Sequence, residues 1–221
     1  MASKDYLELQ RQRAEEALER TMPPADSSPA ALHAAIRDAV FAGGDRIRPV
    51  LALAASEAAA TADGDPDAAL SAAVAIELLH AATRLHATAG DALALPAGDA
   101  LQAMAFGALA APSALSPARA LRLSGILARA ALAAALTPET GDLFAAAAEL
   151  GAVAGGAPDD EVAALAAFGA ELGVATRLAT EPDGHKLAAF HAREAAAHLM
   201  EIPGTPASAA LSDLAEGIIG H

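Results

Sequence analysis

Hydrophobic and polar positions along this chain follow the period of an α-helix. Between its prolines and glycines, apolar residues recur every three to four positions, and no segment has the two-residue alternation of a strand. The pattern predicts an all-α protein of about ten helices. The expected spans are 4–20, 29–42, 49–63, 67–88, 91–110, Pro117–Leu136, 138–154, Asp159–Ala179, 186–200 and Pro206–Ile219.

Helix starts and ends carry their own signals. Glycines follow several predicted helix ends, where a residue without a Cβ can reverse the chain. No obvious linker separates the helices, so we expect one domain over residues 1–221. Four starts pair a capping side chain with proline in the first turn: Ser28-Pro29, Ser116-Pro117, Thr137-Pro138 and Thr205-Pro206.

Composition and charge narrow the possible partners. Hydrophobic residues make up 54% of the 221 residues but aromatic residues only 3%, so the core must consist mainly of alanine and aliphatic side chains. The 14 basic and 28 acidic residues give a net charge of −14, which disfavours nucleic acid and anionic membrane surfaces. The absence of cysteine excludes disulfides and thiolate metal sites.

No segment indicates export or membrane insertion. Residues 1–20 are charged throughout and lack the apolar stretch of a secretory signal. The most apolar tract, residues 100–111, is too short to span a bilayer. We therefore expect a cytoplasmic protein without a membrane span.

Two predicted helices, 91–110 and Pro117–Leu136, are too apolar to lie freely on a surface. The first has no charge after Asp99 and is apolar nearly all round. Such a helix is buried either in the centre of its own bundle or in a subunit interface. Both alternatives are open at this point.

Six segments, in order, resemble the trans-type isoprenyl diphosphate synthases. The stretch AGGDRIRP at 42–49 resembles the family's GGKRxRP helix start, AVAIELLHAATRLH at 73–86 its ExxH…SLxH helix, and GDALALPAGDALQAMAF at 90–106 the next helix. Segments 138–156, 168–178 and 196–219 resemble the KTG helix, the helix before the second aspartate-rich motif, and the carboxy-terminal helices. The resemblance covers nearly the whole chain and implies an isoprenoid-synthase-like helical bundle.

The chain departs from this family at both aspartate-rich motifs, which in the family hold magnesium ions that bridge the allylic diphosphate. Ala87 and Thr88 stand where the first motif begins, and the rest of that motif is deleted. Thr180 and Glu181 stand where the second begins, before a shortened turn. Magnesium requires several oxygen ligands around one small octahedral ion. We therefore expect deletions at the metal-binding rim, no bound magnesium and no other cofactor.

Other acids and histidines offer no replacement metal site. Glu181 and Asp183 lie in a short turn, and the acids at 159–161 are typical of a solvated helix start. His191 and His198 are seven residues apart, beyond the four-residue spacing of a paired metal site, and are interpreted as surface residues.

The cations that bind diphosphate in the family are only partly kept. Asp45 and Glu139 replace two lysines, and each replacement turns attraction for an anion into repulsion. Arg48 and His80 match the family's ligands for isopentenyl diphosphate, so the resemblance makes them vestigial substrate-binding residues. The alternative is that Arg48 pairs with a nearby acid and that His80 is satisfied inside the bundle.

The expected function is that of a catalytically degenerate homologue with no catalytic residues, leaning away from an enzyme. It would be a non-catalytic or regulatory subunit paired with an active prenyltransferase in isoprenoid biosynthesis. The family is typically dimeric, includes unequal pairs, and dimerises through helices equivalent by resemblance to 91–110 and Pro117–Leu136. The alternatives are a homodimeric protein that binds an apolar isoprenoid, and an enzyme with altered prenyl diphosphate chemistry.

Overall fold

Helices make up most of the computed structural model, which describes residues 3–24, 26–88, 90–110, 113–136 and 141–219. These residues form ten α-helices, one short 3-10 helix and no strand, which confirms the all-α prediction. The single-domain assignment of residues 1–221 stays a prediction. The elements are α1 (Ser3–Thr21), α2 (Ala30–Phe41), α3 (Ile47–Ala58), α4 (Pro66–His86), α5 (Ala94–Leu109), α6 (Pro117–Leu136), α7 (Gly141–Ala154), α8 (Asp159–Ala179), α9 (His185–His198), η1 (Leu199–Glu201) and α10 (Pro206–Ile219).

Two of the predicted caps are confirmed and one is wrong. The side chains of Ser116 and Thr205 accept backbone N–H groups three residues on, at 3.4 and 3.1 Å. At the start of α2, by contrast, Pro29 is itself the extended N-cap residue and no side chain caps the helix. The cap predicted at 137–138 lies outside the described residues.

The helix expected from residue 91 begins at Ala94 instead. The Asp91 side chain accepts a hydrogen bond from the N–H of Leu93 at 2.9 Å, which forms a separate turn before the helix. This local side-chain bond competes with helical pairing and delays the start of α5.

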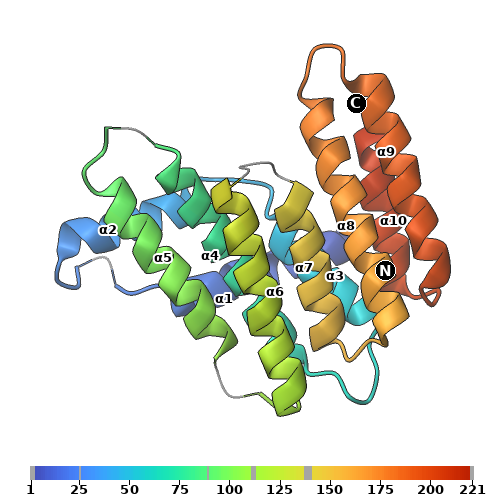
Figure 1. Ribbon diagram of the computed structural model, residues 1–221, viewed down its shortest axis with the longest axis horizontal. Coiled ribbons are helices and arrows are strands. Elements are labelled where there is room, and N and C mark those ends of the chain that lie inside the picture. Colours follow the sequence, from blue (N-terminus) through green and yellow to red (C-terminus); the bar gives the residue numbers. More distant parts are fainter. Residues whose placement is uncertain (1–2, 25, 89, 111–112, 137–140, 220–221) are drawn as a thin grey trace.

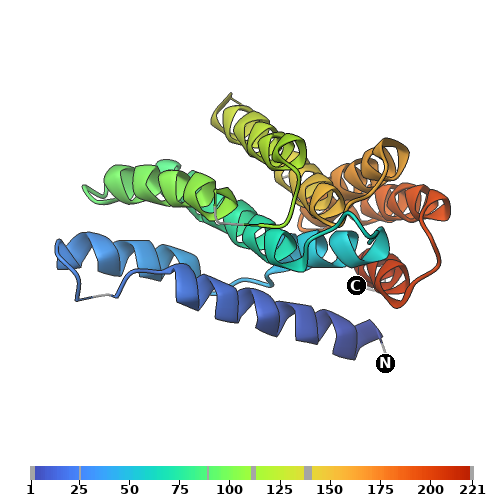
Figure 2. The same ribbon diagram turned by 90° about the horizontal axis from the view of Figure 1, so that it is seen from below.

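The helices pack around α7, which contacts α3, α4, α6 and α8 (Figure 1). Figure 2 shows α1 and α2 as a layer along one side of the molecule, against α4 and α5. The α8–α9–α10 group lies at the other end of the bundle. Long helices that are far apart in sequence, such as α3 and α7, therefore meet in the interior.

Small residues allow α3 and α7 to approach closely. A Cβ added to Gly151 of α7 would lie 2.0 Å from the carbonyl oxygen of Ala52 in α3, and one added to Gly155 would lie 2.3 Å from that of Ser56. Such distances are far below van der Waals contact, so these positions require glycine. The low aromatic content of the sequence is thus matched by a core of alanine, leucine and backbone contacts.

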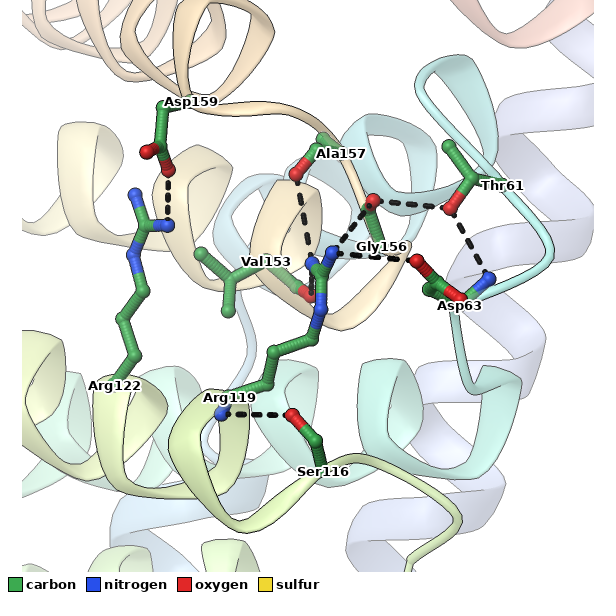
Figure 3. A network of polar contacts seen from close by, with 9 residues as sticks. All are labelled: Thr61, Asp63, Ser116, Arg119, Arg122, Val153, Gly156, Ala157 and Asp159. Atoms are coloured by element: carbon green, nitrogen blue, oxygen red, sulfur yellow. Dashed lines mark hydrogen bonds and ion pairs between the residues drawn. The ribbon is translucent and has the colours of Figure 1, made fainter.

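Arg119 fastens α6 to the end of α7 (Figure 3). Its guanidinium donates to the carbonyl oxygens of Gly156 at 3.1 Å, Val153 at 3.4 Å and Ala157 at 3.5 Å. Thr61 donates to the same Gly156 oxygen at 3.0 Å, which brings the α3–α4 loop to this point. A cation beside the carbonyl oxygens at and just after a helix C-terminus is favourable because it opposes the negative end of the helix dipole.

Two interior helices, α4 and α8, meet the length and hydropathy criteria for a membrane span. Within this bundle, 67% and 50% of their most apolar windows are buried. A core helix of a folded bundle meets the same criteria. The expectation that the chain has no membrane span stays a prediction.

Candidate functional site

A cavity of about 290 Å³ opens where the glycine turn before α3 meets the C-terminal halves of α4 and α8. Gly43 and Gly44 form the turn with φ angles of 103° and 131°, which favour glycine. The lining consists of residues 43–48, then Glu77, His80 and Arg84 of α4, Phe144 of α7, and Thr176, Arg177 and Thr180 at the end of α8.

Arg46 organises the floor of this cavity. It is the N-cap of α3 in a left-handed conformation, with φ 51° and ψ 30°. Its Nε donates to Glu15 of α1 and its Nη1 to Glu77 of α4, both at 2.7 Å. Burial opposes the charge of Arg46, but these two carboxylates outweigh it and raise its pKa. Two ion pairs thus hold a backbone conformation that a non-glycine residue rarely adopts.

Arg48 and His80, the two predicted site residues, line the same cavity. The Arg48 guanidinium carbon lies 4.6 Å from the centre of the Phe144 ring, and its buried Nε has no hydrogen-bond partner. Burial lowers the pKa of Arg48, Glu77 opposes that shift and Arg84 adds to it. Arg48 therefore stacks on an aromatic ring rather than pairing with an acid. Its role in binding a substrate stays a prediction.

His80 is neutral in this setting. Burial, followed by the charges of Arg48, Arg84 and Arg46, lowers its pKa from 6.5 to about 3. A neutral imidazole offers one N–H donor and one acceptor nitrogen. None of the described residues forms a hydrogen bond to the His80 ring. The alternative that His80 is hydrogen-bonded inside the bundle is therefore not supported.

The mouth of the cavity is formed by α4 and α8 and carries two more arginines. Arg84 lies one turn after His80 and is exposed, and Arg177 on α8 pairs with Glu181 at 2.7 Å. The hydroxyl of Thr180 donates to the carbonyl oxygen of Arg177 at 2.7 Å. The sequence patterns gave no reason to select Arg46, Arg84 or Arg177, because only the fold turns them toward one space.

The residues that the sequence resemblance assigns to the two aspartate-rich motifs follow the C-terminal ends of α4 and α8, and the loss of those motifs stays a prediction. α4 ends at His86, just before Ala87 and Thr88, and α8 ends with Thr180 as its C-cap. Within the described ranges, no group of three or more His, Asp or Glu side chains could hold a metal ion. The residues present therefore do not fit the family's magnesium cluster.

Asp159 and His191, which were considered from the sequence as possible metal ligands, form contacts between helices instead. Asp159 at the start of α8 is exposed and pairs with Arg122 at 2.5 Å (Figure 3). His191 is not the surface residue expected from the sequence, since it is half-buried and lies 2.6 Å from Glu171 of α8. That contact joins α9 to α8. Glu139 lies outside the described residues.

Comparison with known proteins finds isoprenyl diphosphate synthases among the homologues of this chain. The chain is 35% identical over 184 residues to a geranylgeranyl diphosphate synthase of Rhodobacter capsulatus, covering 65% of this chain and 63% of the relative. A structure assigned as a farnesyl diphosphate synthase from Marinomonas sp. MED121 superposes with a TM-score of 0.79 and 26% identity, over 99% of each chain. These relatives are geranylgeranyl and farnesyl diphosphate synthases, so the chain is a homologue of the isoprenyl diphosphate synthases. No family model matches this isoprenyl diphosphate synthase homologue.

The name of another relative describes it as one subunit of a heterodimer. The heterodimeric geranylgeranyl pyrophosphate synthase large subunit 1 of Arabidopsis thaliana is 30% identical over 189 residues, covering 63% of this chain and 50% of the relative. The homologue thus spans about half to 63% of the length of these curated relatives.

Proposed function

We propose that this homologue is a catalytically degenerate member of its family that serves as a non-catalytic or regulatory subunit of an active prenyltransferase. The observation that carries the proposal is the chemistry of the cavity mouth. Where paired helices would present carboxylates to magnesium, this chain has Ala87, Thr88 and Thr180, and its Glu181 is engaged by Arg177. A diphosphate leaving group would have no metal to neutralise it.

The outer face of α6 supports a role in assembly. Leu121, Gly125, Ala128, Leu132 and Ala135 are spaced alternately by four and three residues, which is the pattern of a coiled-coil seam. Leu121 and Leu132 are 74% and 62% exposed. We call residues 121, 125, 128, 132 and 135 the α6 seam. Exposed apolar surface of this kind marks a site where another protein binds.

The neighbouring helix α5 is apolar on its outer side as well. It packs on α4, with smaller contacts to α2 and α6, and Leu95 is 64% exposed. The alternative that α5 is a central core helix, surrounded within its own bundle, is therefore wrong. Burial of α5 and α6 against a second chain stays the proposal, and the heterodimeric relative is consistent with an unequal pair.

The test combines activity and co-purification. The isolated chain should show no magnesium-dependent transfer from an allylic diphosphate to isopentenyl diphosphate above a control without protein. When co-expressed with an active prenyltransferase from the same genome, it should purify as a complex and change that enzyme's turnover or product length. Turnover by the isolated chain would overturn the degenerate assignment. A stable homodimer that neither co-purifies with the prenyltransferase nor changes its activity would favour the alternative of a homodimeric isoprenoid-binding protein.

A further inference from the structure

Helix α9 has an outer face with large apolar side chains. Its buried side consists of Ala188, Ala192 and Ala195, which are 1%, 1% and 0% exposed. On the outer face, Leu187 is 50% and Phe190 51% exposed. All five phenylalanines of the chain are described, and only Phe190 is exposed. In a protein with so few aromatic residues, this placement indicates a contact with another molecule.

The Phe190 side chain is held in place by its neighbours. The ring of His191 meets it edge to face, with 5.3 Å between the ring centres and 81° between the ring planes. The Nδ1 of His191 in turn lies 2.6 Å from a carboxylate oxygen of Glu171 in α8. Phe190 is therefore positioned before any partner binds, which lowers the entropy cost of a contact.

The charged residues beside Phe190 follow a symmetric order. Lys186 precedes it by four residues and Glu194 follows it by four, so the three side chains share one side of the helix. All three are exposed, and among the described residues neither Lys186 nor Glu194 has an ion-pair partner. By contrast, the exposed Arg129 of α6 pairs with Glu149 within the chain. The two α9 charges are thus available to another molecule.

This order of charges is complementary to itself. In an antiparallel pair of α9 helices related by a two-fold axis at Phe190, Lys186 of each copy lies level with Glu194 of the partner subunit. The two Phe190 rings meet at the axis, where an offset or edge-to-face contact is favourable. Leu187 lies level with Arg193 of the partner subunit and covers the apolar part of that side chain.

The charge of the whole chain is compatible with a contact at this helix. Two copies that each carry −14 repel each other where acidic faces come within the Debye length of about 8 Å. The 14 residues of α9 include Lys186 and Arg193 and only one acid, Glu194. A contact through α9 therefore adds little to the repulsion between two copies.

We propose that the outer face of α9 binds a second copy of this chain, by antiparallel pairing of the two α9 helices about Phe190. The helix belongs to the α8–α9–α10 group, apart from α6 (Figure 1), so this contact and the α6 seam can be occupied together. The proposal does not depend on the subunit role. One helix pair is smaller than a standard interface of about 1,600 Å², so we expect weak association with a Kd on the order of 100 µM.

Exchange of the two charges tests the pairing. Sedimentation equilibrium of the full chain is measured on both sides of the expected Kd, in wild type and with Leu132→Glu, which disrupts the α6 seam. Lys186→Glu and Glu194→Lys should each weaken self-association by about tenfold or more, because the axis repeats every like-charge contact. The double variant Lys186→Glu, Glu194→Lys should recover to within about threefold of its parent, since it restores opposite charges across the axis.

A cross-link tests the position of the axis. The chain has no cysteine, so Phe190→Cys introduces a single thiol. A disulfide requires Cα atoms within about 7 Å of each other, and a two-fold axis at position 190 brings these two together. Oxidation by air should therefore link two chains faster in this variant than in Ala209→Cys, whose thiol is exposed on α10.

Three results would overturn the proposal. They are a Leu132→Glu chain that stays monomeric at every concentration, a double variant that associates as weakly as the single variants, and equal rates of cross-linking at positions 190 and 209. Circular dichroism shows that each variant is helical. None of these experiments measures prenyl transfer or binding to a prenyltransferase, so failure of the α9 contact is distinguishable from failure of the degenerate-subunit proposal.

Discussion

At the scale of single residues, the two arginines at the start of α3 differ in the groups that balance their positive charge. Arg46 is 3% exposed at its side chain and is shared between Glu15 and the nearly buried Glu77. Arg48, two residues later, instead relies on the Phe144 ring. Neighbouring arginines of one motif therefore have different partners, since Arg46 is held by two carboxylates and Arg48 lies on an aromatic ring.

Replacing Arg46 with methionine should destabilise the protein by about 3–5 kcal/mol, because it leaves Glu77 as an unpaired buried carboxylate. Urea unfolding measures the loss. The double variant Arg46→Met, Glu77→Met should recover most of it, since no buried charge is left alone. If the single variant loses less than about 1 kcal/mol of stability, the carboxylate of Glu77 is not buried and dependent on Arg46 in the way that the prediction requires.

His80 should make stability depend on pH. The unfolded chain binds a proton at this residue near pH 6.5, but the folded chain does so only near pH 3. Acid therefore favours unfolding from about pH 6.5 downward, by about 2 kcal/mol at pH 5, and the effect levels off near pH 3.

Removing His80 tests this pH dependence. His80→Gln should lose less stability than wild type between pH 7 and pH 5, measured by urea unfolding in phosphate-free buffers. His185→Gln, at the exposed start of α9, is the matched control for loss of a histidine. Parallel slopes for His80→Gln and wild type would contradict the prediction.

At the scale of elements, the contact between α3 and α7 depends on glycine. Gly151 faces the carbonyl oxygen of Ala52, and Gly155 faces that of Ser56 one turn later. The spacing of four residues places both glycines on one side of α7. That side sets how deeply α7 enters the bundle, and with it the position of Phe144 beneath Arg48.

Gly151→Ala should therefore destabilise the protein by about 1–3 kcal/mol, even though alanine is the better helix former. Its Cβ would lie 2.0 Å from the Ala52 oxygen, so one helix must move. Gly217→Ala in α10 is the control, because its Cβ meets nothing within 4 Å and should be neutral or slightly stabilising. If thermal unfolding gives the two variants the same midpoint, α3 and α7 do not approach each other closely at Gly151.

At the scale of the whole molecule, an exposed apolar seam coexists with a strong negative charge. Each chain carries −14, so two copies repel each other until salt screens them. Raising the salt concentration should strengthen a homodimer. A less acidic partner would avoid this repulsion, which is a physical reason to favour an unequal pair.

If the α6 seam is the proposed subunit contact, Leu132→Glu should weaken association, because it places an unpaired charge in that seam. Sedimentation at several concentrations, alone and with an active prenyltransferase, measures the effect as at least a tenfold weaker association. Leu187→Glu is the control for association with the prenyltransferase, since Leu187 is 50% exposed on α9 and is not part of the seam. A wild type that stays monomeric in both settings would remove the subunit proposal.

The amino-acid sequence by itself determined the helices and the family resemblance. Helical period, prolines and glycines are local signals, so eight of the ten expected spans matched to within a few residues where the chain is described. The Asp91 turn moved the start of α5 to Ala94, and α3, expected to run up to Gly64, ends at Ala58 instead. Arg48 and His80 were found because motif spacing is also local. Only the tertiary structure decided that Arg46, Arg84 and Arg177 face one cavity with them, since those residues come from three helices. It also decided that Gly151 needs its missing Cβ and that the α6 seam is left uncovered, because burial depends on which distant helix lies alongside.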